Sequence, residues 1–81
     1  MRARHTPPLC VVMDEWGRPR SFLHARRRIR IQEILDTWEE AGRWWQGEEV
    51  RRVYRVLTTA GTVCELHHQP IAGWQLHRVS D

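Results

Sequence analysis

The densest run of chemically active side chains in the sequence is Arg26-Arg27-Arg28-Ile29-Arg30. Guanidinium groups bind phosphate oxygens in a planar, two-pronged geometry, so a row of them suits contact with a nucleic-acid backbone. Over residues 26–34 the side chains alternate with a period of two, which predicts a strand with its isoleucines inward and its arginines outward. One sheet face should therefore be lined with guanidinium groups. The candidate contact residues for nucleic acid or a partner are Arg26, Arg28, Arg30, Trp45 and Arg51.

The same row has an ordinary structural interpretation, in which the arginines pair with the acidic middle of the chain. Residues 1–30 hold eight Arg against two acidic residues, residues 31–50 hold one against six, and residues 51–81 hold four against two. A basic frame thus surrounds an acidic segment. Surface ion pairs contribute little to stability, typically under about 1 kcal/mol, but they would occupy the guanidinium groups. The sequence leaves both interpretations open.

Five tryptophans supply large apolar rings, each with an N–H that needs a partner. Trp44 and Trp45 are adjacent, so both rings cannot face inward from an extended backbone. One ring belongs to the core, and the other covers a sheet edge, stacks on a ligand or meets a partner protein. Trp16 lies in a predicted turn, and Trp16 and Trp44 are the candidate exposed aromatic residues.

Other residue types that could support metal binding or catalysis lack the spacing for it. His67 and His68 are adjacent, and on a strand their rings point to opposite faces and cannot share an ion without a bulge. The carboxylate pairs at 39–40 and 48–49 indicate solvated loop charge rather than an acid–base pair. The sequence shows neither a glycine-rich phosphate loop nor a nucleophile with a positioned base. We expect no catalytic residue, no metal and no cofactor.

The length of 81 residues is sufficient for one domain with a modest core. Residues 1–8 are basic and contain Pro7-Pro8, which predicts a flexible arm without the apolar stretch of a signal peptide, and residues 9–81 should form a single β domain. Cys10 and Cys64 belong to no disulfide or metal motif and indicate free thiols in a reducing compartment. No run approaches membrane-spanning length. We expect a cytoplasmic protein that does not contact a membrane.

Apolar, β-branched runs separated by turn residues predict a mainly β fold with about six antiparallel strands in a small rolled sheet or barrel. From Ile34 the spacing changes, because Ile34, Leu35, Trp38 and Ala41 lie at helical intervals. This predicts one short helical segment between strands 3 and 4. The alternative is that the strand continues through Leu35 and bends, with Trp38 anchoring the loop. The predicted strands cover residues 9–13, 20–24, 26–34, 50–58, 62–68 and 74–79.

Several short motifs follow one another along the chain: Arg27-Arg28-Ile29-Arg30-Ile31, Ile34-Leu35-Asp36-Thr37-Trp38, Arg43-Trp44-Trp45, Tyr54-Arg55-Val56, Val63-Cys64-Glu65-Leu66 and Gly73-Trp74-Gln75-Leu76-His77-Arg78-Val79. Their order resembles a family of small bacterial domains of unknown function. It is also similar to the C-terminal tail of inactive Y-family polymerase homologues of the mutasome type. Two positions depart from the family pattern: Ala25 replaces a usual Gly in a tight turn, and His67-His68 replace more typical aromatic or basic residues.

The resemblance implies an accessory role in DNA damage tolerance and brings no catalytic residues with it. Together with the arginine row, it favours a non-catalytic module that binds single-stranded nucleic acid or helps to assemble a complex with a polymerase-type partner protein. The alternative is a protein-interaction or homodimerisation module unrelated to nucleic acid. Such a module would dock through an exposed sheet edge or an aromatic patch around Trp44 and Trp16.

Overall fold

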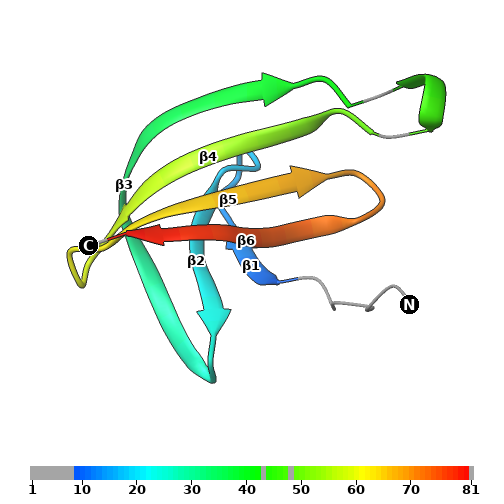
Figure 1. Ribbon diagram of the computed structural model, residues 1–81. Coiled ribbons are helices and arrows are strands. Elements are labelled where there is room, and N and C mark those ends of the chain that lie inside the picture. Colours follow the sequence, from blue (N-terminus) through cyan, green and yellow to red (C-terminus); the bar gives the residue numbers. More distant parts are fainter. Residues whose placement is uncertain (1–8, 43, 48, 81) are drawn as a thin grey trace.

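Six antiparallel strands form one sheet in the computed structural model, which describes residues 9–42, 44–47 and 49–80. The order across the sheet is β1-β2-β3-β4-β5-β6, so each strand pairs with its neighbours in sequence. Figure 1 shows the sheet curling into half a barrel, with the β2–β3 hairpin projecting away from β4–β6. The prediction of a mainly β rolled sheet is confirmed. The strands are β1 Cys10–Met13, β2 Pro19–His24, β3 Arg27–Glu40, β4 Arg51–Thr58, β5 Val63–Gln69 and β6 Gly73–Ser80.

The curl depends on β3, a strand of 14 residues that pairs with two different neighbours. Its first part pairs with β2, and from Ile31 onward it pairs with β4. Its register against β4 shifts between Ile31 and Glu33 and again between Ile34 and Asp36. Bulges of this kind bend a strand and increase its twist, so they allow one strand to follow both halves of the roll.

The helical interpretation of residues 34–41 is wrong, because β3 continues through Glu40. The inward positions Ile31 and Ile34 are three residues apart because a bulge adds a residue between them, and this spacing imitates that of a helix. Between β3 and β4 the described residues contain a single 3₁₀ turn, Trp44–Gln46. Within the described residues, no helix is long and apolar enough to cross a membrane.

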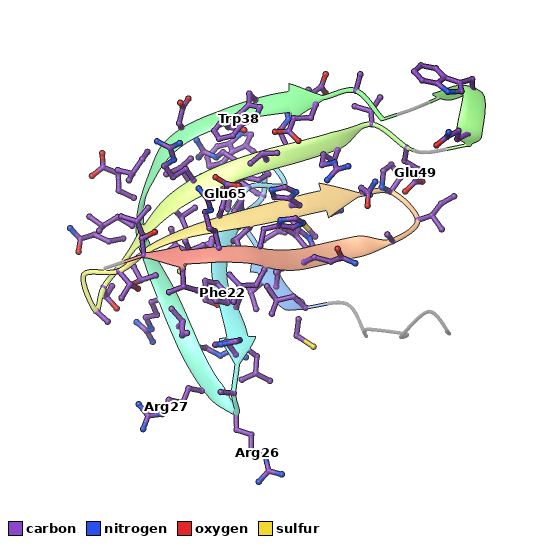
Figure 2. All side chains as sticks on the ribbon, viewed as in Figure 1. Phe22, Arg26, Arg27, Trp38, Glu49 and Glu65 are labelled. Carbon is purple, nitrogen blue, oxygen red and sulfur yellow. The ribbon has the colours of Figure 1, made fainter. Side chains whose placement is uncertain are left out.

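The inner face of the roll holds the core, with Phe22 and Leu66 fully buried. Phe22 projects from β2 toward the other half of the sheet (Figure 2). Cys64 is a small buried side chain, and burial raises the pKa of its thiol, which keeps it protonated. The buried cluster is Phe22, Val56, Cys64, Leu66 and Trp74, and the half-buried residues against it are Leu9, Val11, Ile29, Ile31, Ile34, Tyr54 and Leu76.

The two ends of the sheet approach each other at one point. The Leu9 N–H donates a hydrogen bond of 2.7 Å to the carbonyl oxygen of Trp74, at the start of β6. Beyond this bond, β1 and β6 are the two edges of the sheet in the described part of the chain. Among residues 9–42, 44–47 and 49–80, the roll is therefore held at one corner and open elsewhere. The predicted arm at residues 1–8 lies outside the described residues.

Candidate nucleic-acid interface

Arg28 and Arg30 lie on the outer face of β3, as the alternation predicts. Both are exposed, whereas Ile29 and Ile31 pack against the core cluster. The pairing with β2 places Leu23 opposite Arg28 and Ser21 opposite Arg30. Arg28 Nη1 donates a hydrogen bond of 3.1 Å to Ser21 Oγ, which holds the guanidinium over β2. The two cations therefore lie along the β2–β3 hairpin.

A third arginine joins them around a depression of about 460 Å³, where β3 passes from β2 to β4. We call Arg20, Arg28 and Arg30 the arginine groove. The residues that line the depression are Val12, Arg20, Ser21, Arg28, Arg30, Ile31 and Thr59. Arg20 is not among the contact residues predicted from the sequence. The two-residue turn at Ala25-Arg26 pairs His24 with Arg27, and continuing that register places residue 20 opposite the inward Ile31. Strand alternation therefore could not have grouped Arg20 with Arg28 and Arg30.

That turn presents two more arginines at the tip of the hairpin. Ala25 and Arg26 both have positive φ, 51° and 65°, and lie between the paired residues His24 and Arg27. Positive φ at both central residues is the geometry of a type I′ turn, whose twist matches that of the flanking strands. Figure 2 shows the side chains of Arg26 and Arg27 extending from the tip. Arg26 is therefore a turn residue and does not belong to the alternating row.

The described acidic residues of the middle segment do not neutralise the arginine row. Glu39 forms an ion pair with Arg52 at 3.1 Å, and Glu40 forms one with Arg51 at 3.9 Å. These two carboxylates therefore pair with arginines of β4. The ordinary interpretation required ion pairs between the row and such residues. Within residues 9–42, 44–47 and 49–80, no carboxylate lies within ion-pair distance of the arginines of β2, of the turn or of β3: Arg20, Arg26, Arg27, Arg28 and Arg30.

Exposed apolar side chains share a face with these cations. The registers place Val12, Ser21 and Arg30 in one row across β1–β3, and Leu23 beside Arg28 in the next. Val12 is 48% exposed and Leu23 is 39% exposed. The guanidinium groups of this surface can bind anionic groups of a ligand, and the neighbouring apolar side chains can contact its flat or apolar groups.

The remaining sequence candidates lie elsewhere. Arg51 begins β4 opposite Glu40, at the far end of β3 from Arg28. Trp45 is 66% exposed in the 3₁₀ turn next to that end, and the side chain of Trp44 is outside the described part of the structure. Trp16, in the β1–β2 turn, is 71% exposed, with the Arg18 guanidinium 5.2 Å from its ring centroid. The structure thus brings together Arg28 and Arg30 but not Arg51 or Trp45.

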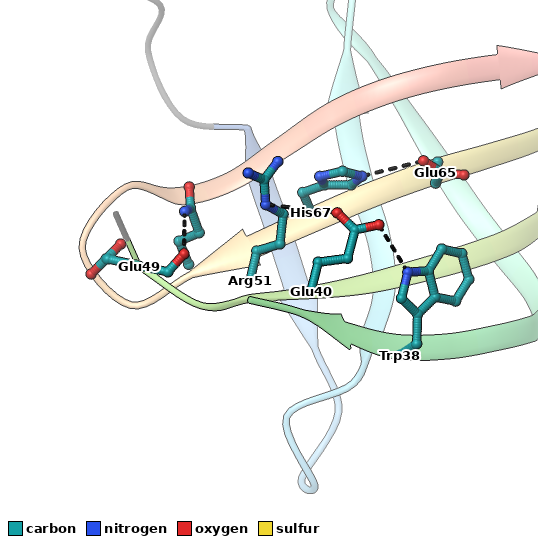
Figure 3. Close-up of polar contacts among 7 residues, drawn as sticks. Trp38, Glu40, Glu49, Arg51, Glu65 and His67 are labelled. Atoms are coloured by element: carbon teal, nitrogen blue, oxygen red, sulfur yellow. Dashed lines mark hydrogen bonds and ion pairs between the residues drawn. The ribbon is translucent and has the colours of Figure 1, made fainter. Parts of the chain in front are cut away.

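A second polar cluster covers the outer face of β3–β6 (Figure 3). The rings of His67 and His77 stack at 3.8 Å between centroids. His67 Nε2 lies 3.3 Å from Glu65 Oε1, while Trp38 Nε1 donates to Glu40 Oε2 at 3.0 Å. His67 is 6% exposed although it lies on the outer face, so these neighbours form a small second layer over the sheet.

Sequence spacing did not reveal the histidine pair, because a bulge creates it. The β5–β6 register moves from Glu65↔Arg78 to Leu66↔Leu76, and this shift leaves His77 as the extra residue. Burial, followed by the nearby charges of His67 and Arg51, lowers the pKa of His77. The hydrogen bond from the Trp38 indole lowers the pKa of Glu40. The cluster therefore favours neutral His77 and ionised Glu40.

The adjacent His67 and His68 point to opposite faces, as predicted. His67 stacks on His77 outside the roll, whereas the ring of His68 lies 4.5 Å from that of Trp74. In the described residues, no three His, Cys, Asp or Glu side chains are grouped so that they could hold a metal ion.

Comparison with known proteins gives one match. Residues 5–81 match the family model described as "Domain of unknown function (DUF6504)". Neither the curated proteins nor the solved structures include a match to the chain. The match supports the resemblance to a family of unknown function and leaves the similarity to polymerase tails without support.

Proposed function

The chain belongs to the DUF6504 family, and on that premise we propose that it is a non-catalytic accessory module that binds single-stranded nucleic acid. The arginine groove is the proposed contact surface. The observation that carries the proposal is the convergence of Arg20, Arg28 and Arg30 on one depression without a carboxylate partner in the described residues.

Unpaired guanidinium groups are the natural ligands of phosphate. They release counterions from the nucleic acid on binding, and each can form two parallel hydrogen bonds to a phosphate. Arg28 and Arg30 are two residues apart on a strand, so their Cα atoms lie roughly 7 Å apart. This spacing is suited to consecutive phosphates of one extended strand.

The apolar neighbours favour a single strand over a duplex. Val12 and Leu23 are exposed on the same face as the cations and could contact the flat faces of unstacked bases. In a duplex these base faces are stacked on one another and cannot be reached. Contacts of this kind carry little sequence information, so we expect weak sequence preference.

The test is fluorescence anisotropy of a labelled single-stranded oligonucleotide titrated with the chain. With about three phosphate contacts, affinity should fall roughly 20-fold between about 50 and 200 mM salt, from a slope near −0.7 per contact. A duplex of the same sequence should bind more weakly. Failure to bind the single strand at the lower salt concentration would overturn the proposal.

A matched pair of variants locates the surface. The double substitution Arg28→Ala, Arg30→Ala should weaken binding and reduce the salt effect to roughly threefold, because one phosphate contact remains. The control, Arg52→Ala with Arg55→Ala on β4, removes the same charge away from the groove. Equal losses in the two variants would mean that net charge alone governs binding, in contradiction to a defined groove.

The biological setting is a further part of the proposal. The order of the sequence motifs alone, which resembles that in the tail of inactive Y-family polymerase homologues, motivates the proposed role in DNA damage tolerance with a polymerase-type partner protein. Co-purification of the tagged chain with such a homologue from the same genome tests this part. The DNA-binding proposal does not depend on its outcome.

A further inference from the structure

A second groove, of about 470 Å³, lies between the β2–β3 hairpin and β6. Its surface is mainly apolar, with Ile29, Leu76 and Val79 lining it above the fully buried Phe22. The volume is within the range of ligand and peptide pockets, roughly 300–1,000 Å³. The full lining is Phe22, His24, Arg27, Arg28, Ile29, Arg30, Thr59, Ala60, Thr62, Cys64, Leu76 and Val79.

One side of this groove is a sheet edge. β6 pairs with β5 on one side only, and Leu76 and Val79 of β6 line the groove. At the start of β6, the Leu9 N–H donates a hydrogen bond to the carbonyl oxygen of Trp74. The free edge of β6 therefore accepts a backbone hydrogen bond from an extended segment. Beyond Trp74, no strand of the described chain covers this edge as far as Ser80. Unpaired edges of this kind are the usual sites of strand addition.

The charge of the groove selects among possible occupants. Its charged lining residues are all arginines, with His24 beside them and no carboxylate. Residues 1–8 contain two Arg and no acidic residue, so the chain's own N-terminus does not complement the groove. A second copy of β6 contains Arg78 and no acidic residue, so it would add positive charge to the groove. An acidic segment of another protein is the complementary occupant.

We propose that the groove between the β2–β3 hairpin and β6 binds an extended, acidic and apolar segment of a partner protein. The segment pairs its backbone with the free edge of β6, lays alternate apolar side chains over Ile29 and Leu76, and directs carboxylates toward Arg27. This groove shares Arg28 and Arg30 with the arginine groove, so the tests rely on Arg27 and Val79, which line this groove and not the arginine groove.

The probe is a fluorescein-labelled peptide of roughly eight residues with alternating glutamate and valine, which spans the edge at about 3.4 Å per residue. Anisotropy should show saturable binding to the full chain, and amide resonances of β6 from residue 76 onward should shift in heteronuclear spectra. A lysine–valine peptide should not bind. A glutamate–valine peptide with alternate amides N-methylated should bind at least about tenfold more weakly, because it cannot form the ladder.

Two variants separate this site from nonspecific attraction. Val79→Asp places a carboxylate in the groove at a position that is 55% exposed, and Arg27→Ala removes the facing cation. Each should weaken peptide binding roughly tenfold, the fold-change expected for one charge-assisted contact. The controls are Val50→Asp, at a similarly exposed valine, and Arg55→Ala on β4, and both should bind as the parent does. Circular dichroism verifies the fold of each variant.

Three outcomes would overturn the proposal. The first is equal binding of the N-methylated peptide, which would mean simple charge attraction. The second is equal weakening by the control variants. The third is a dimer, detected by sedimentation, in which the β6 resonances are already shifted before peptide is added. The occupant of the groove would then be a second copy of the chain. Oligonucleotide binding should be unchanged in Val79→Asp, so failure here leaves the nucleic-acid proposal to its own test.

Discussion

Phe22 is the largest fully buried side chain of the described core, and it comes from the hairpin that carries the arginine groove. Replacing a buried phenylalanine with alanine removes its transfer free energy and leaves a cavity. Phe22→Ala should therefore lower the free energy of unfolding by about 3–5 kcal/mol, measured by urea denaturation. Leu23→Ala, at the adjacent and partly exposed position, is the control and should cost less than about 1 kcal/mol. Similar losses in both variants would argue against the core assignment.

Ala25 occupies a left-handed conformation that glycine adopts without steric cost. Ala25→Gly should raise the free energy of unfolding, by up to about 1 kcal/mol, because relief of the Cβ clash exceeds the added entropy of the unfolded chain. Thermal and urea unfolding measure the change. Ala60→Gly, in the β4–β5 turn and without positive φ, is the control and should not stabilise. Destabilisation by Ala25→Gly would contradict the assigned turn.

His77 should make stability dependent on pH. Burial, followed by His67 and Arg51, lowers its pKa from an ordinary value of 6.5, while Glu65 and Glu40 act in the opposite direction. The unfolded chain then binds the proton more readily than the folded chain does. This difference has no effect above pH 6.5, and stability is lost as the pH falls from there through the lower, folded-state pKa.

The measurement is the urea midpoint across this pH range, for the parent chain and for His77→Gln. The variant should show a shallower decline of the midpoint below pH 6.5, because one titrating group is gone. Identical profiles would mean that His77 does not couple to folding.

Among the elements, β3 shows what the sequence could and could not predict. The alternation over residues 28–31 predicted correctly which side chains face outward, because a strand without bulges keeps a strict period of two. The two bulges after Ile31 break this period, and no local feature distinguished them from the start of a helix. Arg51 was grouped with Arg28 because neither the length of β3 nor its register with β4 can be obtained from local patterns.

Strand position in the sheet should set local stability. β4 and β5 pair on both sides and carry the buried residues Val56 and Leu66, whereas β1 is a short edge strand with exposed side chains. Hydrogen exchange should therefore be slowest at the amides of β4 and β5 and at least about tenfold faster in β1. Exchange followed by heteronuclear NMR measures this order. Equal protection of β1 would indicate that it has a partner beyond β2.

For the whole molecule, the arrangement of charge matters more than the net charge of +3. The sequence showed a basic frame around an acidic segment but could not show which arginines the acids would meet. In the fold, Glu39 and Glu40 lie beside the arginines of β4, and the hairpin at the other end of β3 keeps its cations unpaired in the described residues. A concentrated positive field at one end of the molecule can steer an anionic strand toward it.

The hydrogen bond from Leu9 to Trp74 has a consequence for the order of folding. Every ladder in the sheet joins strands that are neighbours in sequence, so most of the topology consists of local contacts, which form quickly. The Leu9–Trp74 bond instead closes a loop that contains almost the whole described chain, and its entropic cost is recovered only when the intervening hairpins exist. We expect hairpin formation to limit the folding rate, with φ-values near zero at Leu9, because this corner joins last.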